Sequence, residues 1–160
     1  MKRQQGFSLV ELMIVVAIIL IISAIAIPNL LQARMAANES AAVGAVRTIN
    51  VAMVVYQSTY PDTGFATQLS DLGTGGVAPC VAAVNTACLI DSALETGSKS
   101  SYNFIAIGSN GLPNTQYVAA GTPQVGNRSF CSVEDGVVRV DPTGAAIPDY
   151  ATCAALNALP

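Results

Sequence analysis

The sequence predicts an α+β fold, in which one long N-terminal α-helix packs on a small antiparallel β-sheet of about four strands. Three patterns predict it. Residues 7–27 form an apolar run interrupted only by two serines and one glutamate. Apolar or small residues then recur at helical spacing as far as residue 60. From residue 101 onward, apolar and polar residues alternate as they do in half-buried strands.

The apolar run is long enough to cross a membrane. At about 1.5 Å per helical residue, residues 7–27 span about 31 Å, which is close to the hydrocarbon thickness of a bilayer. Lys2 and Arg3 precede the run, and positively charged flanks of membrane helices stay in the cytoplasm. We therefore expect a transmembrane helix with a cytoplasmic N-terminus and an exported remainder.

Glu11 is the residue of this run that needs an explanation. A carboxylate costs about 2.5–3.5 kcal/mol at the centre of a membrane helix and less near its end. A secretory signal peptide, with Ala24–Ala26 as its cleavage motif, has a shorter apolar core that such an acid would interrupt. A plain membrane anchor accounts for the length and the orientation but leaves Glu11 without a role.

The residues around the start of the run offer a third interpretation. The motif GFSLVEL follows a short basic leader that ends at Gly6, and Pro28 comes directly after the apolar run. These residues resemble the class III signal of type IV prepilins and of the related pseudopilins of type II secretion systems. The resemblance is specific over residues 1–35. Beyond about residue 60 it is architectural only, to the helix-on-sheet pilin fold.

The resemblance implies a processing step and a mode of assembly. A membrane prepilin peptidase would remove the leader, residues 1–6, by cutting between Gly6 and Phe7, and would then N-methylate Phe7. Glycine has no side chain and so allows the protease to approach the backbone closely. In the filament, the resemblance implies that the Glu11 carboxylate pairs with the Phe7 amine of a neighbouring subunit. Such a pair offsets part of the cost of two buried charges and sets the register between subunits.

Residues 28–60 are expected to continue the helix as an amphipathic segment. One stripe of apolar or small residues, at steps of three and four, would pack against the head: Ala42, Val46, Ile49, Met53, Tyr56 and Tyr60. Asn50 is expected at the polar surface, and Gly44 is expected to pack closely against the head. Pro28 is expected to kink or locally unwind the helix, and Pro61 to end it.

Residues 61–160 are expected to form a globular head. A loop-rich connector occupies residues 61–100, with a short helical turn at 68–72 and a short helix or strand at 88–94. Four strands in meander order follow over residues 101–142, with one sheet face on the helix and the other facing outward. One hairpin turns around Asp135–Gly136, a pair suited to positive φ. Residues 143–160 form a tail without clear periodicity.

Four cysteines lie after the apolar run. An even number on the exported side of a membrane predicts two disulfides, for which three pairings exist. We favour Cys80–Cys88, which closes a short loop, and Cys131–Cys153, which fastens the tail. A zinc site is the alternative, but the cysteines lack CxxC spacing and there is no histidine.

The sequence contains no candidate active site. Without histidine, the serines, cysteines and carboxylates form no recognisable nucleophile–base set, so we expect no catalytic residue and no cofactor. Four acids could meet near a turn and bind calcium, but their spacing is not that of an EF-hand, and acids are common in turns: Glu134, Asp135, Asp141 and Asp149. We therefore expect no metal site. Downstream of the apolar run, five basic residues are scattered among nine acidic ones, a pattern that does not indicate nucleic-acid binding.

These patterns favour a structural protein over an enzyme: a major pilin that polymerises through its apolar helix into a type IV pilus-like surface filament. The implied partners are further copies of the chain, the inner membrane, a prepilin peptidase/methyltransferase and the pilus or secretion assembly machinery. The chain would lie in the inner membrane before assembly and in an extracellular filament afterwards. A major pseudopilin of a type II secretion system, confined to the periplasm, is the first alternative. A minor pilin, adhesin or membrane-anchored binding module is the second.

Overall fold

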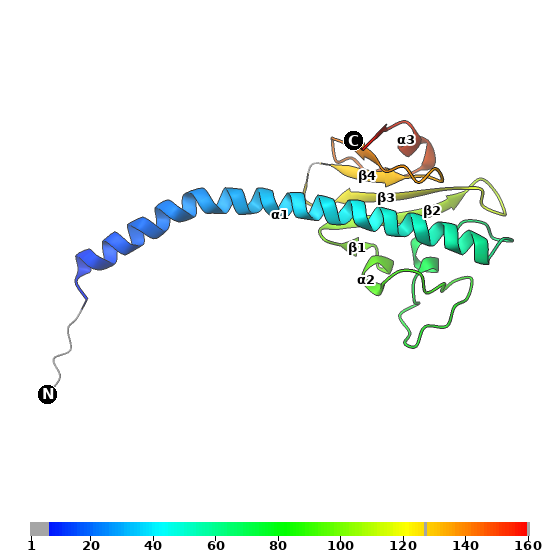
Figure 1. Ribbon diagram of the computed structural model, residues 1–160, viewed down its shortest axis with the longest axis horizontal. Coiled ribbons are helices and arrows are strands. Elements are labelled where there is room, and N and C mark those ends of the chain that lie inside the picture. The colour runs from blue at the N-terminus through cyan, green and yellow to red at the C-terminus, as the bar shows by residue number, and fades with distance from the viewer. Residues whose placement is uncertain (1–6, 127, 160) are drawn as a thin grey trace. The chain divides into compact units, whose positions relative to one another are not determined.

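The computed structural model describes residues 7–126 and 128–159 (Figure 1). The chain divides into two compact units, Met1–Ala37 and Asn38–Pro160. Helix α1, Leu9–Thr59, contributes residues to both. The two units differ in how much of their apolar surface is buried.

In the first unit, α1 is a continuous helix with nearly all of its side chains exposed. Pro28 lies inside the helix, and the residues on both sides of it are helical. The local unwinding expected at Pro28 is therefore wrong for this structure. Because Pro28 has no N–H, one helical hydrogen bond is lost, but its neighbours keep theirs.

In the second unit, α1 buries one side against the head. The predicted stripe is confirmed: Tyr60 is partly buried, and the five other members are fully buried, with Ala45 and Ala52 beside them. Asn50, however, is buried rather than at the polar surface, with 7% of its area exposed. At 100° per residue, position 50 lies at the edge of the buried stripe.

The expectation that Gly44 packs closely against the head is also wrong. Gly44 is exposed, and a Cβ at this position would meet nothing within 4 Å. Position 44 lies on the side of the helix opposite the buried stripe, so Gly44 does not pack against the head.

Six strands form one antiparallel sheet in the order β1 to β6. Their bounds are β1 Ser98–Lys99, β2 Tyr102–Ser109, β3 Gln116–Pro123, β4 Ser129–Ser132, β5 Arg139–Asp141 and β6 Asn157–Ala158. The four predicted strands correspond to β2 to β5, which confirms the meander. The structure also contains β1 and β6, which the sequence did not predict. Each has two residues, too few for an alternating pattern to be detected.

Both faces of the sheet are covered. Tyr117 and Ala119 of β3 pack on the α1 side, whereas Val118 and Ala120, which alternate with them, belong to a second apolar cluster. The C-terminal segment covers this second face, with α3, Tyr150–Ala154, lying beside β4 (Figure 1). The expectation that this face points outward is therefore wrong.

The predicted hairpin between β4 and β5 is confirmed, with a longer connection than a tight turn. Cys131 pairs with Arg139 at its open end, and residues 133–138 connect the strands. Of the two residues expected to suit positive φ, only Gly136 adopts it, at 70°. A wider loop therefore reaches from the sheet toward α1.

The connector contains two short helices, η1 Leu69–Leu72 and α2 Ser92–Glu95. The first confirms the helical turn predicted at 68–72. Glu95, at the end of α2, holds the loop that follows η1, because its carboxylate accepts hydrogen bonds from the N–H of Thr74 at 2.9 Å and of Gly75 at 2.8 Å. One carboxylate thus orders a loop that contains no charged residue of its own from 72 to 90.

Candidate assembly surfaces

Helix α1 begins at Leu9, two residues before Glu11, the acid to which the resemblance gives a role in assembly. Ser8 directly precedes the first helical residue, and its backbone N–H donates a hydrogen bond to Glu11 Oε2 at 2.9 Å. This contact is one half of a Ser-x-x-Glu capping box. Sequence analysis missed it, although a serine followed three residues later by a glutamate, before an apolar run, is a recognisable helix start.

The capping contact provides Glu11 with a partner in its own chain. A carboxylate in the first turn also interacts favourably with the helix dipole. Both effects reduce the cost of an acid at the end of an apolar helix. Phe7, the expected mature N-terminus, is 85% exposed, and Gly6 lies outside the described residues.

The apolar stretch that follows Glu11 is exposed. Within residues 7–126 and 128–159, α1 is the one helix long and apolar enough to cross a membrane, and none of its most apolar window is buried. Large side chains are exposed along this whole stretch: Leu12, Met13, Ile14, Ile18, Ile19, Leu20, Ile21, Ile22, Ile25 and Ile27. A surface of this size requires either lipid or another protein to cover it.

The head half of α1 carries a second exposed apolar surface. Val51, Val54 and Val55 lie on the side of the helix opposite the buried stripe, and Val51 is 66% exposed. A groove of about 610 Å³ lies beside these valines. Its lining residues are Arg47, Asn50, Val51, Val54, Val55, Tyr117, Glu134, Asp135 and Gly136. The groove is therefore lined by both apolar and charged residues.

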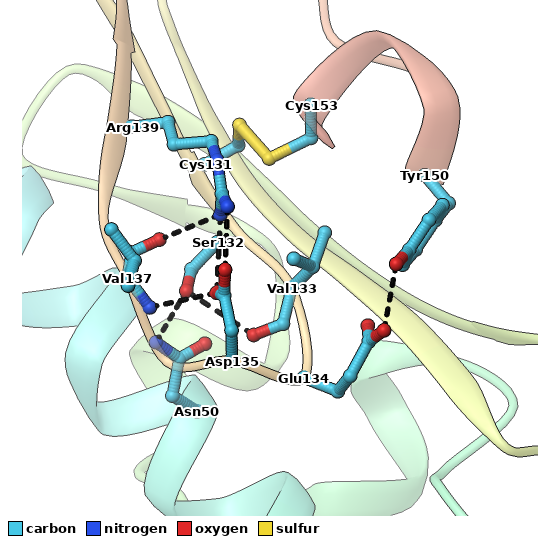
Figure 2. A network of polar contacts seen from close by, with 10 residues as sticks. All are labelled: Asn50, Cys131, Ser132, Val133, Glu134, Asp135, Val137, Arg139, Tyr150 and Cys153. Carbon is cyan, nitrogen blue, oxygen red and sulfur yellow. Dashed lines mark hydrogen bonds and ion pairs between the residues drawn. A yellow bond between two sulfur atoms is a disulfide. The ribbon is translucent and has the colours of Figure 1, made fainter. Parts of the chain in front are cut away.

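The β4–β5 loop supplies the two carboxylates that line this groove, Glu134 and Asp135, and Figure 2 shows their polar contacts. Asp135 accepts a hydrogen bond from the Val137 N–H at 2.9 Å and forms an ion pair with Arg139. The hydrogen bond from the Arg139 guanidinium lowers the pKa of Asp135. Glu134 accepts a hydrogen bond from the Tyr150 hydroxyl at 2.7 Å. These contacts hold both carboxylates in place.

A buried polar group ties the helix to the sheet beneath the groove. Asn50 Nδ2 donates to Ser132 Oγ at 2.9 Å, and Asn50 Oδ1 accepts from the Tyr117 hydroxyl at 3.2 Å. Burial raises the pKa of Tyr117 far above its ordinary value, so the phenol stays protonated and donates. Figure 2 shows Asn50 reaching from α1 to Ser132.

The remaining candidate calcium ligands serve local turns. Asp141 accepts from the Thr143 N–H at 2.8 Å, and Asp149 caps α3 by accepting from the Thr152 N–H at 2.7 Å. In the part of the chain that the structure describes, no three or more His, Cys, Asp or Glu side chains are grouped to hold a metal ion. The four acids therefore act as turn, cap and ion-pair residues in this structure.

The four cysteines form two disulfides, Cys80–Cys88 and Cys131–Cys153. These are the two pairs that the sequence favours. The first closes the connector loop. The second joins β4 to α3, and both of its cysteines are fully buried, so it fastens the C-terminal segment over the second sheet face.

Two comparisons with known proteins match the start of the chain. The family model of the prokaryotic N-terminal methylation motif matches residues 1–27. Over 40 residues the chain is 55% identical to the Type IV wide pilus major component PilA4 of Thermus thermophilus, which is 25% of this chain and 30% of that protein. The matched region thus spans less than a third of the relative's length. No solved structure matches the chain. The start of the chain therefore carries a prokaryotic N-terminal methylation motif and is similar to the matched part of a type IV pilus major component.

Proposed function

We propose that this chain is the major subunit of a type IV pilus-like filament. The observation that carries the proposal is the apolar stretch of α1, exposed throughout and preceded by a methylation motif. The relative whose sequence matches is itself described as a major pilus component. A helix of this kind is stable in lipid, and it is equally stable in a bundle of identical helices.

Processing starts at the cytoplasmic face of the inner membrane. Prepilin peptidase cuts between Gly6 and Phe7 and methylates the new amine of Phe7. Residues 7–27 hold the processed chain in the membrane, with residues 28–160 on the exported side. The pilus machinery then moves the helix from lipid into the growing filament.

Glu11 acts in this transfer as a registry group. In the single chain, its carboxylate accepts from the Ser8 N–H. In the filament, it also pairs with the positive Phe7 amine of a neighbouring copy. A misplaced copy would leave both charges unpaired in an apolar bundle, which is far more costly than the aligned state.

The proposal is tested by mass spectrometry of filaments sheared from cells. The expected chain comprises residues 7–160, begins with N-methylated Phe7 and is the main protein of the sample. A mature chain that begins at Ile27, after the Ala24–Ala26 motif, would contradict the proposal. So would a chain that is found only in the membrane fraction of cells with abundant pili.

The same preparation distinguishes the alternatives. A pseudopilin would form no long extracellular fibres under normal expression, and its chain would stay in the periplasmic and membrane fractions. A minor pilin or adhesin would be present in the filaments at a small fraction of the amount of another subunit.

A further inference from the structure

The turn between β2 and β3 contains the only asparagine–glycine pair of the sequence, Asn110–Gly111. Both residues are exposed and have positive φ, 73° for Asn110 and 101° for Gly111. Because glycine has no side chain, the side chain before it can come close to the glycine nitrogen. An asparagine in this position can react with its own backbone, since attack of that nitrogen on the side-chain amide carbon closes a five-membered ring.

The nitrogen of Gly111 is available for this attack. Its N–H donates no hydrogen bond to any residue that the structure describes, and a Cβ on Gly111 would meet nothing within 4 Å. The Asn110 side chain donates one exposed hydrogen bond, from Nδ2 to Thr115 Oγ1 at 3.0 Å. Water competes with such a bond, so this contact holds the amide only weakly.

A second pair of the chain could close the same kind of ring, Asp135–Gly136, but there both reacting groups are held. The Gly136 N–H donates to the Val133 carbonyl at 2.9 Å. The Asp135 carboxylate forms an ion pair with Arg139 and accepts a hydrogen bond from the Val137 N–H at 2.9 Å. These contacts favour its ionised form, and a carboxylate is a poor electrophile. The two pairs therefore differ in whether ring closure first requires the fold to open.

We propose that Asn110 is a site of spontaneous deamidation in the folded protein. The Gly111 nitrogen bonds to Asn110 Cγ, the Cγ–Nδ2 bond breaks, and Nδ2 leaves as ammonia with the proton of the Gly111 amide. Solvent water then opens the cyclic imide at either of its carbonyls, which leaves aspartate or isoaspartate at position 110. No group is oxidised or reduced.

The head should keep its fold after this reaction, because the turn is anchored beyond the reacting pair. Asn114 is buried, its N–H donates to the Thr63 carbonyl at 2.8 Å, and its Nδ2 donates to the Phe65 carbonyl at 2.9 Å. An aged chain would therefore carry one additional negative charge on an exposed turn. The reaction needs no second copy of the chain, so the inference does not rest on the proposed function.

The test compares deamidation in the folded and the unfolded chain by mass spectrometry. The mature chain is incubated in mildly alkaline buffer, either folded in detergent or unfolded in urea with its disulfides reduced. Trypsin then releases residues 100–128 as one peptide, in which Asn103 and Asn114 are internal controls. Folding should slow the reaction of Asn110 by less than about tenfold, because the pair reacts without local unfolding. Fragmentation of the peptide should show both aspartate and isoaspartate at position 110.

The Asp135–Gly136 pair is the matched control within the same chain. Folding should slow the formation of isoaspartate at Asp135 at least about ten times more strongly than at Asn110, since that loop must open first. Gly111→Ala, measured in the unfolded chain, should lower the rate at Asn110 by about tenfold or more, because a Cβ hinders the approach of the nitrogen. In the unfolded chain, strain at positive φ does not affect this comparison.

Two outcomes would overturn the inference. If folding slowed Asn110 by about tenfold or more, or as strongly as Asp135, the turn would have to open before it reacts. If aspartate formed at position 110 without isoaspartate, water would have hydrolysed the amide directly and no ring would have formed. Neither outcome would bear on the pilus function, which the analysis of sheared filaments tests separately.

Discussion

At the residue scale, the role of a polar side chain in the head depends on its hydrogen-bond and ion-pair partners more than on its residue type. Asp135 is an example. The sequence predicts only an acid in a turn. In the structure, its carboxylate holds the β4–β5 loop by accepting a hydrogen bond from the Val137 N–H and by forming an ion pair with Arg139. The hydrogen bond from the Arg139 guanidinium lowers the pKa of Asp135 most; burial raises it, and the hydrogen bond from the Val137 N–H lowers it further, so the net shift is downward. The ionised form is thus the one that the fold favours.

This shift predicts an acid dependence of stability. Since the folded pKa lies below the unfolded value of about 3.9, the contribution of Asp135 is fully present above pH 4 and is lost as the pH falls through the folded pKa. Because the pair is partly exposed, the contribution is small, at most about 0.5 kcal/mol. Asp135→Asn should lower the free energy of unfolding at pH 6 by this amount and leave it unchanged at pH 2.

The measurement is urea unfolding of the detergent-solubilised chain, followed by the near-ultraviolet circular dichroism of its tyrosines. Arg139→Gln should give the same loss at pH 6, and the two substitutions together should cost no more than either alone. Equal losses at both pH values would show that Asp135 acts by packing and not through its charge.

At the element scale, the C-terminal segment completes the core of the head. It supplies Ile147 and Cys153 to the second apolar cluster, and the Cys131–Cys153 disulfide fixes it to β4. The bond closes a chain separation of 22 residues. Without it, α3 and β6 would be held mainly by a small apolar cluster and by short pairings.

We expect replacement of both Cys131 and Cys153 by serine to destabilise the head by about 3 kcal/mol, through the freedom that the unfolded chain regains. Hydrogen exchange measured by mass spectrometry should show the loss of protection first in residues 143–158. The matched control replaces Cys80 and Cys88, whose separation is 8 residues, and should leave the exchange of residues 143–158 unchanged. Equal protection of this segment in both variants would show that packing alone holds it.

At the scale of the whole molecule, the two units differ in whether their apolar side chains are buried. Among the described residues, the buried apolar side chains lie between Ala42 and Cys153, in the second unit. The first unit buries almost nothing in the single chain and presents its apolar surface to its surroundings. Changes in the first unit should therefore affect assembly without affecting the stability of the head.

The substitution Glu11→Gln tests whether a change in the first unit affects assembly without affecting the stability of the head. The variant should enter the membrane and fold its head with wild-type stability, because Glu11 accepts its hydrogen bond from Ser8, its own neighbour at the start of the helix. It should yield at least tenfold fewer filaments, since the neutral amide no longer pairs with a charged amine in an apolar bundle. Asp62→Asn, a similar change at an exposed acid of the head, is the control and should assemble normally. Wild-type filament amounts from Glu11→Gln would refute the registry role.

Much of this molecule could be predicted from sequence because its patterns are long or chemically distinctive. The apolar run and the stripe from Ala42 to Tyr56 extend over many helical turns, so their period is clear. Strands β2 and β3 each have eight residues, enough for alternation to appear. The methylation motif depends on residue identity at adjacent positions, which needs no knowledge of the fold.

The sequence by itself determined the main elements, the long apolar segment and the methylation motif, since each is set by residues close together in the chain. Only the tertiary structure decided which surfaces remain uncovered. Asn50 is buried because Ser132 and Tyr117, 82 and 67 residues away, meet it from the sheet. The second sheet face is covered because the tail folds back over it, whereas Val51, Val54 and Val55 of α1 stay exposed among the described residues. Contacts between residues far apart in sequence leave no periodic pattern, so the exposed apolar surfaces of the described residues could be located only in the tertiary structure.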